Sequence, residues 1–451
     1  MSREIPIQSI RKVALAALAG TSIEWYDFFI YATAAALVFP SVFFSSDMPP
    51  LVGLLASFST FAVGFVARPV GGVLFGHFGD CFGRKRALVS ALMLMGVATT
   101  LIGCLPGYGV IGVTAPALLI LLRFLQGLAI GGQWAGAVLI VTETAPRNSR
   151  GFYGSFAQAG APVGVVLANL AFLIVTSNVS PQAFVTWGWR IPFIVSIALI
   201  GLALYMQLRI EETVTFRALQ ARAGARTPEL KPGREASRSP VLEALRLHPR
   251  QIVLAAGAFM AVQVTFYILI AFVIAYGTSS AGLALPRETM LLAVLIAAVV
   301  MVPALLLSAA FSDRYGRRGI YIAGATALGI WAFALFPLIE TRSLLWITVA
   351  VSVGQVFVAM MYGPQAAFLS EMFGTNVRYS GASLGYQLGA IAGGALAPLI
   401  ATAILARYES SFGISVYIAA ACLITVVATA LLQETYRTDL NEEGGRVLRG
   451  S

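Results

Sequence analysis

The chain has 451 residues, of which 58% are hydrophobic and only 11% are charged. This balance excludes an ordinary soluble domain. A membrane-spanning helix needs roughly 20 mainly apolar residues, so the apolar runs leave room for about twelve helices. Because the sequence lacks the alternation typical of a membrane β-barrel, we expect an all-α integral membrane protein with twelve transmembrane helices.

The formal net charge of +10 falls on alternate loops of the chain. Arg and Lys gather in one set of loops, such as those at 84–86, 147–150, 217–250 and 314–318, whereas intervening loops such as 106–116 carry neither. Since positive loops stay on the cytoplasmic side, we expect both termini in the cytoplasm and a multi-pass protein of the cell inner or plasma membrane. Nucleic acid is not an expected partner, because no aromatic interleaving or binding module accompanies the charge.

The residues that carry most metal and nucleophilic chemistry are sparse. Cys81, Cys104 and Cys422 are scattered, without the spacing of a metal site or a disulfide framework. No nucleophile stands with a base, and no phosphate-binding loop or ATP site is visible. We therefore expect neither an enzyme nor a metal site, and no cofactor beyond a proton as coupling ion. The lipid bilayer and a small molecule are the expected partners of a monomer.

The first predicted helix, residues 13–39, carries two acids within an apolar span, Glu24 and Asp27. They stand three residues apart and Tyr31 follows one turn later, so the three side chains share one face. Acids inside a membrane span are costly, face a protein interior or an aqueous cavity, and by default mark a proton or substrate pathway. We predict that Asp27 and Glu24 carry the proton; the alternative is a buried ion pair that only locks helices together.

The next two predicted helices, residues 51–75 and 87–105, flank a charged loop between Gly76 and Arg86. Its spacing Asp-x-x-Gly-Arg-(Lys/Arg) recurs at Asp313, again between apolar runs. Arg68 stands near the inner end of the helix before this loop. It either belongs to a site or only reaches the loop with its long side chain.

A second pair of strings repeats in the same way. Glu143 precedes Arg150 by seven residues, and Glu371 precedes Arg378 by the same number. Two loops that repeat at nearly one offset indicate a duplicated chain, and internal repeats are a signature of secondary transporters. A duplicated channel or membrane-embedded enzyme is the alternative.

The duplication predicts two six-helix halves, residues 1–210 and 251–451, joined by a basic cytoplasmic linker at 211–250. At the cytoplasmic ends, the repeated acids can meet Arg residues or helix N-termini. We predict that these loops form a gate, made of Gly76, Asp80, Gly83, Arg84, Arg86, Glu143, Arg150, Asp313, Arg317, Glu371 and Arg378. The alternative, that the basic loops only fix topology, does not explain the repeated acids.

Arg123 lies in the fourth predicted helix, residues 116–142, and is surrounded by apolar sequence. An unpaired guanidinium there would be expensive, so we expect a carboxylate partner and prefer Asp27. Uncharged polar side chains inside other spans can orient a ligand by hydrogen bonds. The predicted substrate-binding residues are Arg123, Tyr31, Gln126, Gln133, Trp134, Gln158, Gln263, Tyr267, Tyr362, Gln365, Tyr386 and Gln387.

With these residues in hand, the chain resembles the major facilitator superfamily and, within it, the metabolite:proton symporter family. The superfamily's loop signature is matched by Gly76, Asp80, Gly83, Arg84 and Lys85. Closer marks of the family are Glu24-Trp-Tyr-Asp27-Phe, Arg68-Pro-x-Gly-Gly, Trp187-Gly-Trp-Arg-Ile-Pro-Phe and Val377-Arg-Tyr-Ser-Gly-x-Ser-Leu. The resemblance implies twelve helices in two halves that alternate access to a central site.

The resemblance is nearest to shikimate-type transporters, which implies proton-coupled uptake of a small organic acid such as shikimate or 2-oxoglutarate. Related sugar porters pair a helix 1 Asp with a helix 4 Arg, and Asp27 with Arg123 looks similar. Two positions depart from the family pattern, since Gln133 replaces a Glu and Cys81 replaces a basic residue. A proline- or betaine-type zwitterion symporter, or a drug or metabolite antiporter, are the alternatives.

Overall fold

The computed structural model describes residues 7–82, 84–131, 138, 141–142, 144–209, 246, 249–372 and 378–436, and every regular element in this part is helical. Most of the predicted linker and the C-terminal tail lie outside these residues. For some helical residues, including 79–82, 84–88 and 378–380, the backbone is described but not the side chain. The expected all-α membrane fold is confirmed.

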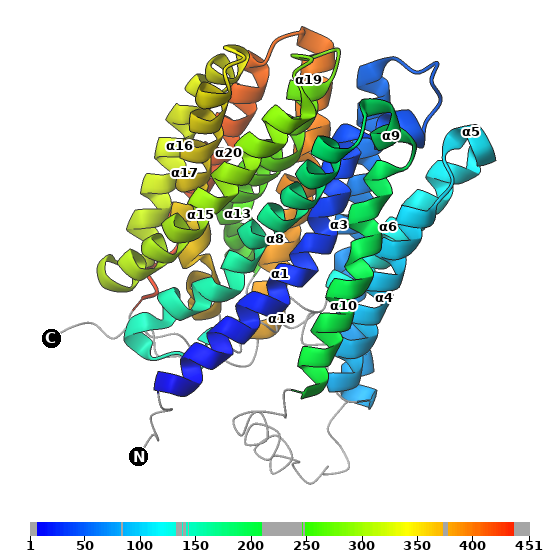
Figure 1. The fold of residues 1–451 in the computed structure, drawn as a ribbon. Helices are drawn as coiled ribbons and strands as arrows, with labels where there is room; N and C mark the ends of the chain where they lie inside the picture. Colours follow the sequence, from blue (N-terminus) through cyan, green and yellow to red (C-terminus); the bar gives the residue numbers. More distant parts are fainter. Residues whose placement is uncertain are drawn as a thin grey trace, which may run out of the picture.

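In the described part of the first half, six helices form the passes, and none of them contains a π-helical turn (Figure 1). Short helices α2 (Phe39–Val42), α5 (Tyr108–Ile111) and α9 (Pro181–Thr186) lie in the connections. The six passes are α1 (Ile7–Leu37), α3 (Pro50–Phe82), α4 (Arg84–Cys104), α6 (Thr114–Ile130), α8 (Arg150–Asn178) and α10 (Ile191–Arg209).

Two passes of the second half are interrupted by π-helical turns, η3 and η4. Such turns are rare in helices and often mark functional sites. The seventh pass is α13 (Pro249–Tyr267), η3 (Ile268–Phe272) and α14 (Val273–Thr278); the eleventh is α18 (Arg378–Gly389), η4 (Ala390–Ala395) and α19 (Ala397–Tyr408). The others are α15 (Arg287–Tyr315), α16 (Arg317–Glu340), α17 (Leu344–Met372) and α20 (Phe412–Leu431).

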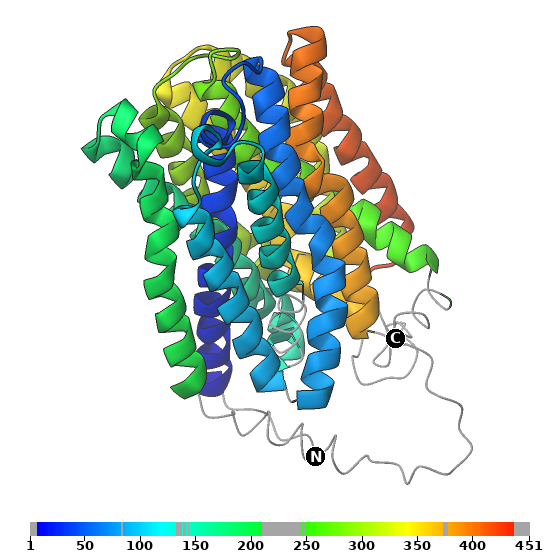
Figure 2. The same ribbon diagram turned by 90° about the vertical axis from the view of Figure 1, so that its right-hand side faces the viewer.

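Among the described residues, nine helices are long and apolar enough to cross a membrane, and three shorter apolar helices complete the bundle. The halves meet where α8 packs along α15 and where α3 packs against η4 and α19 (Figures 1 and 2). In the span formed by α13, η3 and α14, 94% of the most apolar window is buried. This span therefore lies at the centre of the bundle, whereas α4, α10, α16 and α20 lie at its periphery.

The prediction of a loop between Gly76 and Arg86 is wrong, because most of this segment is helical. Helix α3 continues to Phe82 and α4 begins at Arg84. Apolarity marks the part of a helix within the bilayer but not its end, since a 33-residue helix is about 50 Å long and the hydrocarbon core only about 30 Å. As a consequence, Arg68 lies near the middle of α3 rather than near its inner end.

Glycines let α3 and α6 approach closely. A Cβ atom on Gly71 would lie 1.9 Å from the carbonyl oxygen of Leu128, and one on Gly127 would lie 2.2 Å from that of Gly64. Small residues commonly allow such backbone contact between membrane helices. This packing fixes the position of α6, and with it the position of Arg123.

Candidate functional site

The aromatic rings and the hydrogen bond that the structure gives Arg123 come from the first half of the chain. The guanidinium carbon of Arg123 is 4.3 Å from the ring centroid of Phe28, 4.1 Å from that of Tyr31 and 4.8 Å from that of Phe61. Its Nη1 donates to Oε1 of Gln126 at 3.0 Å. Stacking on aromatic faces is a favourable environment for a desolvated cation, so rings rather than a carboxylate surround this arginine.

The expected ion pair between Asp27 and Arg123 is absent from the described ion pairs. Asp27 is fully buried, and neither carboxylate oxygen has a hydrogen-bond partner within the described part of the chain. The side chain is turned by about 100° from Phe28 around α1, toward the Ser196 hydroxyl on α10. Glu24 is near enough for the two carboxylates to repel each other when both are charged.

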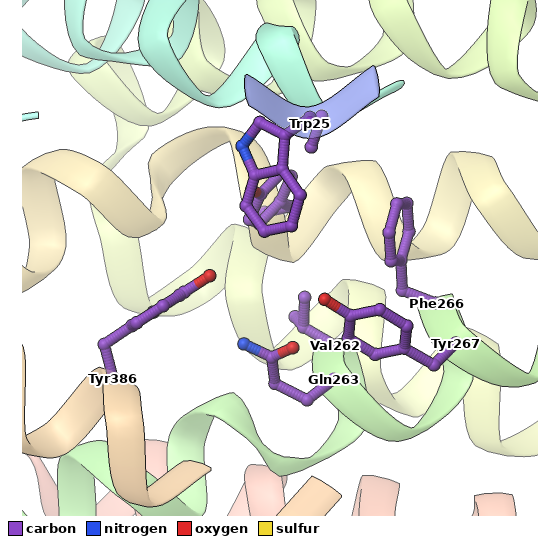
Figure 3. A pocket seen from close by; sticks show the side chains of 8 residues that line it. Trp25, Val262, Gln263, Phe266, Tyr267 and Tyr386 are labelled. Atoms are coloured by element: carbon purple, nitrogen blue, oxygen red, sulfur yellow. The ribbon is translucent and has the colours of Figure 1, made fainter. Parts of the chain in front are cut away.

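Between the halves lies a small cavity of about 10 Å³, which is room for about one water molecule. The first half contributes Trp25 and Ala161 to its wall, and the second half contributes the rest. Figure 3 shows the Tyr267 hydroxyl, the Tyr386 hydroxyl and the Gln263 amide directed toward this space. The lining residues are Trp25, Ala161, Val262, Gln263, Phe266, Tyr267, Tyr362 and Tyr386.

Four predicted substrate-binding residues thus meet in one place, and the structure adds Trp25 from the first half. Gln158, Gln365 and Gln387 are also buried. Neither the oxygen nor the nitrogen of the Gln365 amide has a partner among the described residues. Buried polar atoms without partners are costly and invite a ligand or water. Gln133 and Trp134 lie outside the described residues.

Arg68 belongs to this site, a role that the sequence left undecided. Its guanidinium carbon lies 4.3 Å from the ring centroid of Phe65, 4.5 Å from that of Phe28 and 5.6 Å from that of Trp25. The hydroxyls of Tyr267 and Tyr386 are within its hydrogen-bonding reach.

Arg68 is only 1% exposed, and its Nε and Nη2 have no partner among the described residues. No described ion pair involves Arg68 or Arg123. The buried guanidinium groups of Arg68 and Arg123 both pack against the ring of Phe28, and they bring two positive charges to the central site.

Four predicted gate residues form a buried cluster, which we call the charged cluster, made of Arg150, Asp313, Arg317 and Glu371. Arg317 Nη1 lies 2.6 Å from Asp313 Oδ1, and its Nη2 lies 3.2 Å from Glu371 Oε1. Arg150 approaches the same Glu371 oxygen at 3.7 Å. Because Arg150 belongs to the first half and the other three to the second, the cluster joins the halves at one end.

Asp313 also closes the N-terminus of α8 across the same boundary. Its two carboxylate oxygens accept hydrogen bonds from the backbone N–H groups of Gly151 and Phe152, both at 2.8 Å. A carboxylate at a helix N-terminus satisfies free N–H groups and interacts favourably with the helix dipole. An acid of the second half therefore contacts the N-terminus of a helix of the first half.

Two residues of the charged end were not predicted, Glu434 and Thr435. Glu434 accepts hydrogen bonds from the backbone N–H of Arg317 at 2.9 Å and of Arg318 at 3.0 Å. The Thr435 hydroxyl donates to Glu371 Oε2 at 2.8 Å. The only sequence signal was an acid just after the last apolar run, which fits a cap or a solvated tail equally well.

For the other predicted gate residues the structure describes no side-chain contact. Gly83 and Glu143 lie outside the described residues, and only the backbone is described for the others. These predicted gate residues are Gly76, Asp80, Arg84, Arg86 and Arg378.

Comparison with known proteins agrees with this architecture. Residues 12–442 match the family model of the sugar (and other) transporters. The inner membrane metabolite transport protein YhjE of Escherichia coli is 39% identical, over 96% of this chain and 97% of the relative. The shikimate transporter of the same organism is 38% identical, with the same two coverages.

Among solved structures, the xylose transporter XylE from E. coli, in a partially occluded inward-open conformation, superposes with a TM-score of 0.70. The two chains are 17% identical, and the match covers 94% of this chain and 98% of the other. Such a likeness shows the fold.

The chain belongs to the sugar (and other) transporter family of the major facilitator superfamily. It is a multi-pass membrane protein and a secondary transporter, not an enzyme. The expected resemblance to metabolite transporters nearest to the shikimate type is confirmed.

Proposed function

We propose that this transporter takes up a small organic acid together with protons by alternating access. The observation that supports it most is the pair of buried guanidinium groups, Arg68 and Arg123, without a described ion-pair partner, near a mainly aromatic cavity between the halves. A buried charge without a partner is unfavourable. A carboxylate that enters the site would relieve this cost.

The polar atoms around the cavity suit a substrate that also carries hydroxyl groups. Tyr267, Tyr386 and Gln263 direct hydrogen-bonding groups toward it (Figure 3). Such convergent polar groups within an otherwise aromatic pocket fix the orientation of a ligand. Shikimate, a hydroxylated carboxylate that the name of one relative suggests, is therefore the first candidate.

Asp27 is the proposed proton carrier, with Glu24 as its neighbour. An ionisable group buried inside a membrane span is a functional candidate by default, most often in a proton or ion pathway. Because Asp27 and Arg123 are not paired, the proton would act on α1 and its contact with α10 rather than by releasing Arg123. We propose that the charged cluster closes the cytoplasmic side and that both termini lie in the cytoplasm, as the distribution of Arg and Lys over the loops suggests.

Substrate exchange tests the proposed substrate class without requiring a proton gradient. Purified protein in liposomes loaded with one unlabelled compound is given the same compound with a label outside, for shikimate, 2-oxoglutarate and betaine in turn. We expect exchange of shikimate or 2-oxoglutarate, which carry net negative charge, and none of the zwitterion betaine. Exchange of betaine alone would replace this proposal with the zwitterion symporter. In a separate measurement with an imposed inward proton gradient, expulsion of substrate driven by that gradient would replace it with the antiporter.

A further inference from the structure

The two buried arginines differ in what surrounds them. The described contacts of Arg123 are with α1, α3 and α6 of the first half, through Phe28, Tyr31, Phe61 and Gln126. A Cβ atom on Gly64 would lie only 2.6 Å from its Nε. The backbone of α3 therefore closes the Nε edge of this guanidinium and leaves little room for a carboxylate.

Arg68 contacts both halves of the chain. Phe28, Phe65 and Trp25 of the first half surround its guanidinium, and the hydroxyls of Tyr267 and Tyr386 approach it from the second half. Three of these five residues, Trp25, Tyr267 and Tyr386, line the central cavity. In a transporter whose halves move around a central site, a side chain at this boundary can hold a substrate in both arrangements.

The unpartnered atoms of Arg68 have the geometry of a carboxylate receptor. Nε and Nη2 have no described hydrogen-bond partner, and the N–H bonds of these two atoms point in parallel from one edge of the guanidinium plane. Two parallel N–H groups match the two oxygens of a carboxylate, which gives strong and directional binding. The aromatic rings hold the plane of the group and keep water away from it.

We infer that Arg68, through its Nε and Nη2 edge, is the residue that binds the carboxylate of the substrate, with the Tyr267 and Tyr386 hydroxyls beside it. Arg123 adds positive charge from behind the ring of Phe28 without touching the substrate. This assignment rests on the proposed function, namely that the substrate is a carboxylate. It gives substrate contact to Arg68, whose role the sequence leaves open, rather than to Arg123, which the sequence favours.

Binding of an acid and of its neutral amide separates the two roles. The probes are shikimate and its carboxamide, measured by calorimetry on the purified full-length protein. We expect Arg68→Gln to weaken binding of the acid by about 100-fold, because two charge-assisted hydrogen bonds are lost, and to leave binding of the amide nearly unchanged. Arg123→Gln should weaken binding of the acid by about tenfold, because the charge that is removed is more distant from the substrate. This variant should keep the preference for the acid over the amide.

Two milder variants keep the test decisive if Arg68→Gln does not fold. Arg68→Lys retains the charge but not the two-pronged edge, and should lose about tenfold in binding of the acid. Tyr267→Phe should weaken binding of the acid by a smaller factor, because only one hydroxyl is removed. Melting temperatures report whether each variant is folded.

The outcomes distinguish this inference from the function on which it rests. If the wild-type protein binds the acid, and Arg123→Gln rather than Arg68→Gln or Arg68→Lys removes the preference for it, the assignment to Arg68 is overturned and the proposed function stands. If the wild-type protein binds neither shikimate nor 2-oxoglutarate but binds the zwitterion betaine, the net-anionic substrate class is wrong, and the inference and the proposed function fall together.

Discussion

Asp27→Asn is expected to abolish proton-driven accumulation of substrate while exchange of substrate across the membrane continues. Asn has nearly the shape of Asp but cannot take up or release a proton. The proton gradient is then no longer coupled to substrate transport. The accumulation ratio should fall to about one, the value of a carrier that only equilibrates its substrate. Uptake with and without an imposed inward proton gradient measures the ratio, and exchange at equal pH measures the remaining cycle.

Stability provides an independent reading of the same variant. Asp27 is fully buried and its carboxylate oxygens have no hydrogen-bond partner within the described residues. Removing a buried charge of this kind lowers a desolvation cost, so the melting temperature of Asp27→Asn should rise or stay level. Glu24→Gln, one turn earlier, tests the second acid in the same assays. Full accumulation in both variants would refute the assignment of the proton to these acids.

Glu371→Gln should open the cytoplasmic side. Glu371 is 4% exposed, receives two interactions from Arg317 and one from Arg150, and accepts a hydrogen bond from Thr435. Removing one partner of a buried ion pair typically costs about 3 kcal/mol or more. Since the cluster joins the two halves, this cost falls on the closed arrangement and should shift the equilibrium toward the open one by about 100-fold.

A buried position between the halves can report this opening. Ala366 on α17 is fully buried and lies 3.5 Å from where a Cβ atom on Gly154 of α8 would be. Ala366→Cys is introduced after the native cysteines have been replaced by Ser, and its labelling rate is measured from the cytoplasmic side. We expect Glu371→Gln to raise that rate strongly and Glu288→Gln, at an exposed acid, to leave it unchanged. Equal rates in Glu371→Gln and wild type would show that the cluster does not hold the gate.

Most of the architecture could be predicted from the sequence, because the bilayer requires long apolar segments that are visible in the sequence. Long apolar runs specify spanning helices, and Asp313 and Glu371 were found because their strings repeat those at Asp80 and Glu143. Polar residues inside apolar runs, such as Gln263 and Tyr267, were expected to face the interior, and they do. Each of these predictions depends on a local pattern that needs no knowledge of helix rotation.

The failures depend on tertiary geometry. Arg68 was placed too near the membrane surface, because charged and glycine-rich sequence continues a helix beyond the bilayer without any visible break. The pairing of Asp27 with Arg123 failed, because the rotation of α1 turns Phe28 rather than Asp27 toward α6. Glu434 was missed because a cap supplied by the chain after its last helix has no repeat to reveal it.

The most direct test of the account is accumulation of labelled shikimate by the purified protein in liposomes under an imposed inward proton gradient. We expect uphill accumulation that a protonophore abolishes and that 2-oxoglutarate or another bound carboxylate competes away. Uptake that only equilibrates, or is unaffected by the protonophore, would contradict proton-coupled symport of an organic acid.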